Sequence, residues 1–323
     1  MKPVRFLLSL AAELAKVRIA HSAFNDKLAA LWIGVDKGFF KKHRVDVEVL
    51  QIRSSSPTMA ALASGELQMT YTNPGVVLGA KAGGMDVALF AGLVNKAQGE
   101  IISSQAVKGP EDLKGKRIGV QTVGGGVWGL TMFALDYWGL DPKRDKIFIQ
   151  SVGDESALAQ ALLANNIDAT YLSYSLANDL KKKGFHSLVD LMETGTPYQG
   201  LGLAAHRAYL QRNPDTVDGV LRGVLESVAF IKNPANRAAV ADNLAGHMRL
   251  SRPADIEVSC QLLPLLYDYD IRPSLEGTRT MHRLLSSINP QMQKVRAEDV
   301  IDDAPVQRLM KGSFYNQFLE AVR

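Results

Sequence analysis

Leu67-Gln68-Met69-Thr70-Tyr71 and Ile167-Asp168-Ala169-Thr170-Tyr171 are two matching stretches that lie about a hundred residues apart. Each ends in Thr-Tyr and carries the apolar and β-branched residues that are typical of a buried strand. Val17-Arg18-Ile19-Ala20 and Arg117-Ile118-Gly119-Val120 form a second matching pair with the same separation. Such a spacing is well beyond the periods of solenoid repeats, so the sequence predicts two similar lobes.

Both lobes are predicted to begin with a strand, a loop, a helix and a second strand. In the first lobe the loop, helix and second strand occupy residues 21–26, 28–40 and 45–49. The same order recurs in the second lobe, at residues 122–126, 127–138 and 147–149. Strands that alternate with helices indicate a mostly parallel sheet, whose ligand crevice lies beyond the carboxyl ends of the strands. We therefore expect both sets of loops to face one cleft.

The predicted fold is α/β, with two Rossmann-like lobes that have mostly parallel sheets and are joined by two hinge crossings. Residues 105–198 form the second lobe, and residues 17–104 together with 199–323 form the first. The crossings are expected near residues 105 and 197. Signals such as Asn213-Pro214 begin a series of helices, which we expect to pack on the first lobe.

Residues 1–16 resemble a degenerate signal for secretion, because Lys2 and Arg5 precede a short apolar run. Glu13 departs from the small residues that a cleavage site prefers. We expect export to the periplasm. The alternative is a short amphipathic helix in a cytoplasmic protein.

The composition is that of a soluble globular protein, with 46% hydrophobic and 22% charged residues in 323. The net charge of +4 is scattered, and its longest basic run is Lys181-Lys182-Lys183, so we expect no nucleic-acid partner. Cys260 is the single cysteine, which excludes an intramolecular disulfide, and the six histidines are dispersed. We expect a monomer without a metal or a cofactor.

Three further stretches resemble a known family, the substrate-binding proteins of ABC transporters of the nitrate, sulfonate and taurine type. They are the elements "dKGFF", "aLasGeiD" and "DLkGKkvgv" of that family, which match residues 31–42, 60–67 and 112–120. The resemblance covers about residues 17–240. It implies a type 2 periplasmic binding protein fold, a small-molecule ligand and an ABC permease as partner. The chain departs from the family at Gln68 and at Ser173-Tyr174-Ser175, which leaves the ligand open.

The same superfamily includes a thiamine-pyrimidine synthase, so a cytoplasmic pyrimidine-processing enzyme is the alternative function. That enzyme uses a Cys-rich motif, which a chain with Cys260 alone lacks. The sequence has no recognisable nucleophile elbow or metalloprotease motif. Asp168 and Asp190 are candidates for a carboxylate pair, and we interpret them as a surface residue and a loop residue.

The glycine-rich loop that opens the helix at residues 127–138 is the strongest candidate for a binding element. The positive end of a helix favours ligand oxygens, and glycines let them approach the backbone amides closely. Gly124, Gly126 and Gly129 also match a dinucleotide fingerprint, but no acidic residue follows at the usual place. A third interpretation is a glycine turn that binds nothing.

The residues expected to touch the ligand follow the strands of both lobes or lie near a crossing. Most carry small hydrogen-bonding groups, and the four aromatic residues Phe24, Trp128, Tyr174 and Tyr198 are candidates to clamp an apolar body. We expect them to hold a small organic anion or an amphipathic molecule, such as a sulfonate, a carboxylate or a heteroaromatic compound. They are Ser22, Phe24, Asn25, Thr72, Asn73, Gly75, Thr122, Val123, Gly124, Gly125, Trp128, Ser173, Tyr174, Tyr198 and Gln199.

Overall fold

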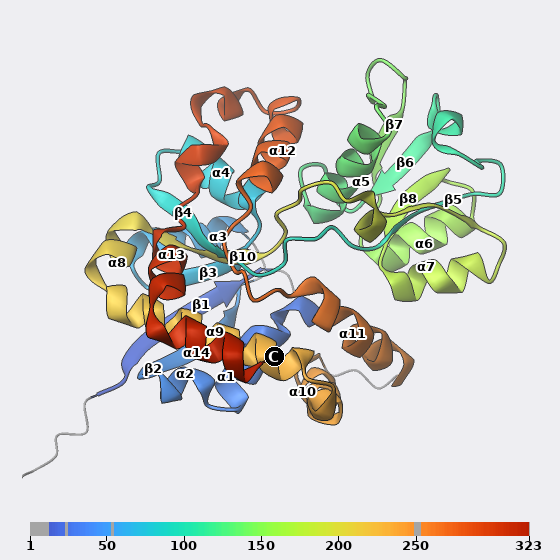
Figure 1. Ribbon diagram of the computed structural model, residues 1–323. Coiled ribbons are helices and arrows are strands. Elements are labelled where there is room, and N and C mark those ends of the chain that lie inside the picture. The colour runs from blue at the N-terminus through green and yellow to red at the C-terminus, as the bar shows by residue number, and fades with distance from the viewer. Residues whose placement is uncertain (1–12, 23–24, 53–54, 249–252, 323) are drawn as a thin grey trace, which may run out of the picture.

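Two mixed sheets of five strands form the centres of two lobes in the computed structural model, which describes residues 13–22, 25–52, 55–248 and 253–322 (Figure 1). In spatial order, the first sheet consists of β2 (Val45–Gln51), β1 (Ala15–His21), β3 (Met69–Thr72), β10 (Gly202–His206) and β4 (Val87–Gly92). The second sheet consists of β7 (Phe148–Ser151), β6 (Arg117–Val120), β8 (Ala169–Leu172), β5 (Glu100–Ser103) and β9 (His186–Asp190).

The two sheets have the same topology. The strand β1 pairs in parallel with β2 and β3, and β6 pairs in parallel with β7 and β8. One strand in each sheet runs against the others, namely β10 between β3 and β4, and β5 between β8 and β9. The prediction of mostly parallel sheets is confirmed. The antiparallel strands are those that directly follow a crossing between the lobes.

The repeat extends to individual hydrogen bonds. The Thr70 hydroxyl donates to the Ala20 carbonyl at 3.0 Å, and the Thr170 hydroxyl donates to the Gly119 carbonyl at 2.9 Å. Each bond ties the third strand of a lobe to the first strand of the same lobe. In both lobes the third strand is followed at once by a helix, α4 (Pro74–Ala82) or α7 (Tyr174–Lys181). The duplication predicted from the sequence therefore extends to equivalent side-chain hydrogen bonds in the two lobes.

Helices cover both sheets. The first lobe has η1 (Asp26–Leu28), α1 (Ala29–Asp36), α2 (Phe39–Lys42), α3 (Ser55–Ser64) and α4. The second lobe has η2 (Pro110–Leu113), α5 (Gly126–Tyr137), α6 (Glu155–Leu163), α7 and η3 (Leu191–Thr194). The C-terminal part adds α8 (Arg207–Arg212), α9 (Pro214–Lys232), η4 (Pro234–Asn236), α10 (Arg237–Met248), α11 (Pro253–Leu266), α12 (Leu275–Ser286), η5 (Pro290–Lys294), η6 (Ala297–Val300), α13 (Ala304–Lys311) and α14 (Ser313–Ala321).

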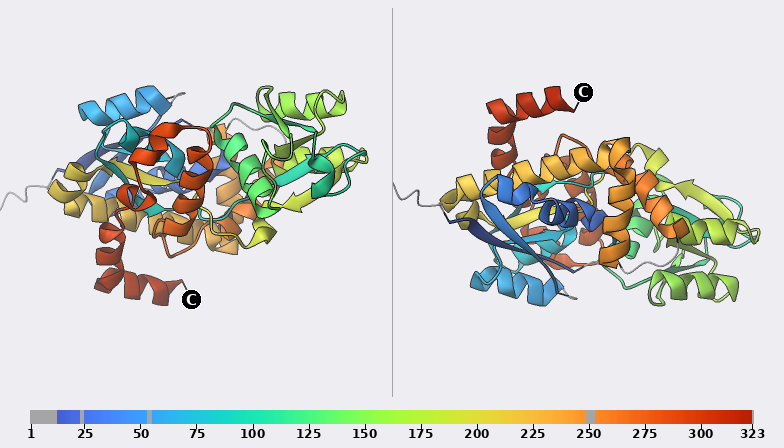
Figure 2. Two further views of the ribbon diagram at one scale, coloured as in Figure 1. Left: turned by 90° about the horizontal axis from the view of Figure 1, so that it is seen from above. Right: turned by 90° about the horizontal axis from the view of Figure 1, so that it is seen from below.

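Most of the C-terminal helices pack on the first lobe, as predicted, but two of them also reach the second lobe (Figures 1 and 2). The helix α9 packs against α1 and α2, and Cys260 of α11 is buried in the same core. The helix α12 lies between α4 of the first lobe and α5 of the second, and α11 contacts α7. Arg283 of α12 forms an ion pair with Asp136 of α5, and Leu284 is buried in the core of the second lobe. The lobes are thus in contact through both helices.

The two crossings between the lobes occupy residues 93–99 and 195–201. They are hydrogen-bonded to each other, because Gly200 N donates to Val94 O at 2.8 Å and Val94 N donates to Leu201 O at 2.9 Å. The first crossing therefore lies earlier than the predicted position near residue 105. The sequence places residues 100–103 in the first lobe, but in the structure they form β5 of the second sheet, where Lys181 pairs with Glu100 at 2.7 Å.

The beginning of the first lobe also differs by two residues from its predicted start at residue 17. Ala15 and Lys16 already belong to β1, where they pair with Val45 and Asp46. Residues 1–12 of the possible signal segment lie outside the described residues. None of the helices in the described ranges combines the length and the apolar character that a bilayer crossing requires.

Candidate functional site

The loop after β1 is fixed by two tyrosines of the first lobe. The hydroxyls of Tyr71 and Tyr267 both donate to the carbonyl of Lys27, at 3.0 and 2.7 Å. The Asn25 side chain caps η1 by accepting from Lys27 N at 3.1 Å, so its oxygen serves the local fold. Ser22 is half-buried beside this loop, and Phe24 lies outside the described residues. The backbone of residues 25–28 is therefore held firmly at the carboxyl end of β1.

The start of α4 is a second structural cap. Asn73 accepts from Val76 N at 3.2 Å, which satisfies one of the free amides of the first helical turn, and Thr72 before it is buried. Gly75 faces α12, where a β-carbon on it would come within 3.3 Å of Leu285 Cδ1. Of these three predicted site residues, Gly75 thus faces α12, and the Asn73 oxygen is used by the first turn of α4.

The glycine loop of the second lobe is exposed and has the geometry of an open helix start. Gly125 N donates to Thr122 O at 3.1 Å, Gly124 has a φ of +82°, and α5 begins at Gly126. Val123 is 56% exposed. The first amides of α5 have no carbonyl of their own helix to bond, and the partial positive charge there suits a ligand oxygen.

The third glycine of the dinucleotide fingerprint has a packing role. Gly129 lies inside α5, where a β-carbon would come within 3.3 Å of Met281 Cε on α12. The spatial order of the second sheet, β7-β6-β8-β5-β9, also differs from the order of a dinucleotide-binding domain. In the described ranges no three His, Cys, Asp or Glu side chains are grouped as the ligands of a metal ion would be.

Ser173 and Tyr174 begin α7 at the carboxyl end of β8. Ser173 N donates to Glu155 Oε2 at 2.8 Å, and the Tyr174 hydroxyl donates to Asp190 Oδ1 at 2.6 Å. Burial, and then the bond to Asp190, raise the pKa of Tyr174 above its usual value. Both residues lie where the sequence predicts them, at the end of the third strand.

The carboxylates of Asp168 and Asp190 lie at opposite ends of β8 and do not form a pair. Asp168 precedes β8 and binds the Arg117 guanidinium at 3.0 Å through both oxygens, which lowers the pKa of Asp168. Asp190 lies on β9 opposite Glu100, which in turn faces Leu172 at the other end of β8. The two carboxylates therefore cannot act together as a catalytic acid and base.

Two of the predicted aromatic clamps pack in protein cores. Trp128 is 2% exposed and belongs to the core of the second lobe, because it lies on the inner face of α5 beneath the glycine loop. Trp128 is therefore a core residue and not an exposed clamp, which corrects the prediction. Tyr198 packs edge to face on Phe133, with ring centroids 5.4 Å apart, and burial raises its pKa to about 12.

Gln199 is a part of the second crossing and is fully buried. Its Oε1 accepts from Ser274 N at 2.7 Å, whereas its Nε2 has no hydrogen-bond partner. The Asn95 Oδ1 of the first crossing is likewise buried and unpaired. The Gln98 Oε1 of the first crossing is also unpaired, so one donor and two acceptors are left unpaired on the two crossings, which is unusual for buried polar groups.

Tyr171 of β8 lies in the core of the second lobe, beside the first crossing. Its ring covers Gly99, where a β-carbon would come within 2.5 Å of the ring. Burial, followed by the carboxylates of Glu155 and, more weakly, Asp26 of the first lobe, raises the pKa of Tyr171 well above its usual value. Tyr171 therefore packs the second lobe against the first crossing.

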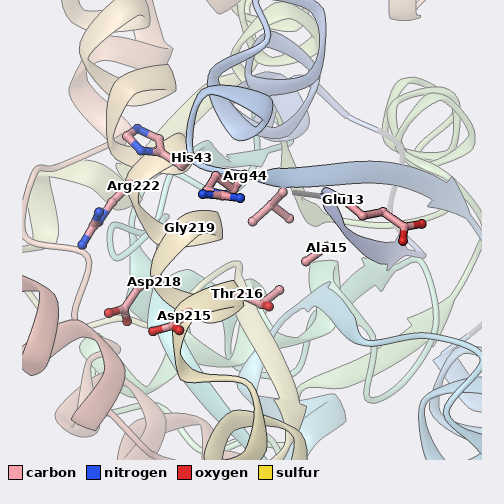
Figure 3. A pocket seen from close by; sticks show the side chains of 10 residues that line it. Glu13, Ala15, His43, Arg44, Asp215, Thr216, Asp218, Gly219 and Arg222 are labelled. Carbon is pink, nitrogen blue, oxygen red and sulfur yellow. The ribbon is translucent and has the colours of Figure 1, made fainter. Parts of the chain in front are cut away.

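A pocket of about 460 Å³ lies elsewhere, on the outer side of the first lobe (Figure 3). Ala15 and Val45 in its lining are the first residues of β1 and β2, so it lies at the amino ends of these strands. The rest of its lining includes the charged side chains of Arg44, Asp215 and Asp218. This pocket contains none of the predicted ligand contacts.

The topology of the two sheets and the paired crossings define the class of two-lobed periplasmic binding proteins. The periplasmic aliphatic sulphonate binding protein SsuA from Escherichia coli has the same fold, with a TM-score of 0.71, 19% sequence identity, and coverage of 89% of this chain and 97% of that one.

The profile of the NMT1/THI5-like family matches residues 25–238, and the chain belongs to this family. Two relatives carry names of binding proteins. YtlA of Bacillus subtilis is 23% identical over 267 residues, which cover 81% of this chain and 79% of YtlA. BAB2_1146 of Brucella abortus is 27% identical over 304 residues, which cover 88% of this chain and 92% of that protein.

Proposed function

We propose that this protein is the solute-binding component of an ABC importer and captures a small molecule between its lobes. The observation that carries this proposal is the pair of similar lobes, joined by two hydrogen-bonded crossings and contacted on both sides by α12. The relatives with binding-protein names and the fold shared with SsuA support the same function.

In this proposal the ligand first binds to one lobe, and rotation about residues 93–99 and 195–201 then brings the other lobe onto it. Only contacts that are better in the closed state drive the closure. The amides at Gly124 and Gly126 bind an oxygen of the ligand, which fits a sulfonate, a carboxylate or a polar heteroaromatic compound. The closed protein then delivers the ligand from the periplasm to the permease.

A thermal-shift screen with sulfonates, carboxylates, nitrate and pyrimidines tests this function. A ligand at a hundred times its Kd is expected to stabilise the protein by about 2.7 kcal/mol, which raises the Tm by several degrees. Recovery of the compound unchanged after incubation is expected for a binding protein. Conversion of a stabilising compound into a product would contradict the proposal and favour an enzyme.

A further inference from the structure

Side-chain amides connect the two crossings to the segment that leads into α12. Gln199 Oε1 of the second crossing accepts from Ser274 N at 2.7 Å, and Asn95 Nδ2 of the first crossing donates to Arg272 O at 3.0 Å. Ser274 is the N-cap of α12, because its hydroxyl accepts from Gly277 N at 3.0 Å. One polar atom of each amide is therefore bonded to this segment.

The other polar atom of each amide is buried and has no partner among the described residues. Asn95 Oδ1 is an unpaired acceptor, and Gln199 Nε2 is an unpaired donor. The two side chains are neighbours, because the position of a β-carbon on Gly92 would lie 2.7 Å from Asn95 Oδ1 and 2.7 Å from Gln199 Oε1. Unpaired buried polar groups are costly, so this arrangement of the crossings has a free-energy cost that another arrangement can remove.

The two unpaired groups are complementary to each other. In this structure Ser274 N holds the oxygen of the Gln199 amide, and not its nitrogen, close to the position that Asn95 Oδ1 also approaches. A half-turn of the amide would direct Nε2 toward Asn95 Oδ1, but it would take the acceptor away from Ser274 N. The Gln199 amide can therefore satisfy Ser274 N or Asn95 Oδ1, and not both.

The bond to Ser274 matters for the lobes because of the position of α12. This helix lies between α4 of the first lobe and α5 of the second (Figure 1). Its Arg283 Nη2 donates to Asp136 Oδ2 of α5 at 2.8 Å. Gln199 thus holds the start of a helix that contacts both lobes.

We propose that Gln199 exchanges hydrogen-bond partners when the lobes move relative to each other. In the arrangement of this structure, Gln199 Oε1 holds the start of α12 through Ser274 N. In the second arrangement, Gln199 Nε2 donates to Asn95 Oδ1, which joins the two crossings directly, and the start of α12 is released. This inference goes beyond the proposed function, since it concerns the movement of the lobes and holds for any ligand.

Double electron–electron resonance between spin labels on the two lobes tests the proposal without a ligand. Ala63→Cys on α3 and Gln160→Cys on α6 place the labels at exposed positions of equivalent helices, and Cys260→Ala removes the native thiol. We expect two distances between the labels in the otherwise wild-type chain. Asn95→Ala should lower the population of the second distance, relative to the first, about fivefold. The reason is that only the second arrangement loses the bond with Gln199.

A second variant separates this pairing from a general effect on the crossing. In a Gln199→Met background, Asn95→Ala should no longer change the ratio of the two distances, because the donor to Asn95 Oδ1 is gone. Asn236→Ala is the matched control, since its Nδ2 also donates to a backbone carbonyl, that of Phe230, at 3.1 Å and outside the crossings. It should leave the ratio unchanged.

Two results would overturn the inference. One is a single distance between the labels in the otherwise wild-type chain. The other is an effect of Asn95→Ala that is the same with and without Gln199→Met. Stabilisation by an unchanged compound in the thermal-shift screen, alongside either result, would leave the proposed function standing.

Discussion

Gly126→Trp is expected to abolish ligand binding while the protein stays folded. Gly126 is exposed at the first position of α5, and a β-carbon on it would have no heavy atom within 4 Å. The indole would cover the amides that we assign to the ligand. Losing two or more hydrogen bonds to a polar ligand weakens binding about 100-fold or more. Titration should show this loss, and urea unfolding should show a stability within about 1 kcal/mol of the wild type.

The control for this variant is Gly246→Trp on α10, where a β-carbon also has no heavy atom within 4 Å. Unchanged binding in the Gly126 variant would show that the glycine loop is a turn and not a site. Gly125, which the sequence alone suggests for this test, is less suitable. A β-carbon there would come within 2.7 Å of the Thr122 hydroxyl, so a bulky residue would also disturb the turn.

Gly277→Val is expected to destabilise the protein by about 2–4 kcal/mol and to weaken ligand binding. Gly277 lies in the first turn of α12, against the second crossing. A β-carbon on it would come within 2.2 Å of the Tyr198 carbonyl carbon and 2.3 Å of Gln199 N. These are backbone atoms, so either α12 or the crossing must move.

Urea unfolding and ligand titration measure the two effects. Gly246→Ala is the control, since the same class of change at an open helical position normally stabilises a helix by up to about 1 kcal/mol. A free energy of unfolding of Gly277→Val equal to that of the wild type would mean that α12 does not pack tightly on the second crossing. In that case the position of α12 between the lobes would have no bearing on their movement.

The position of α12 explains why Gly277→Val should also weaken ligand binding. The helix contacts α4 and α5, and its Arg283 binds Asp136 of the second lobe. Both crossings are also attached to the segment before α12, through Gln199 to Ser274 N and through Asn95 to Arg272 O. A displacement of α12 would therefore change its contacts with both lobes and with both crossings.

Much of the fold was predictable because the same strand sequences occur in both lobes. The stretch 117–120 forms β6 as expected, and the stretches 67–71 and 167–171 contain most of β3 and β8. The strand β5 was missed because it has only four residues and directly follows a turn at Gly99, where φ is +90°. Its place in the second sheet depends on pairing with β8 and β9, which local patterns do not reveal.

The candidate site was less predictable than the fold. Sequence patterns place Asn25 and Asn73 after strands, but only the structure shows that their oxygens cap η1 and α4. Trp128 follows the glycine loop in sequence, yet the helical turn directs it into the core. The contact made by Tyr171 was also not predictable from the sequence. Its strand position indicated a core residue, and only the structure shows that its ring covers Gly99 of the first crossing.

A crystal structure with a bound ligand from the thermal-shift screen tests the central claim most directly. We predict electron density for the ligand between the lobes, in contact with the backbone amides of Gly124 and Gly126. Density in the outer pocket beside Arg44 and Asp215, with side chains filling the space at the strand ends, would contradict the proposal that the ligand is captured between the lobes.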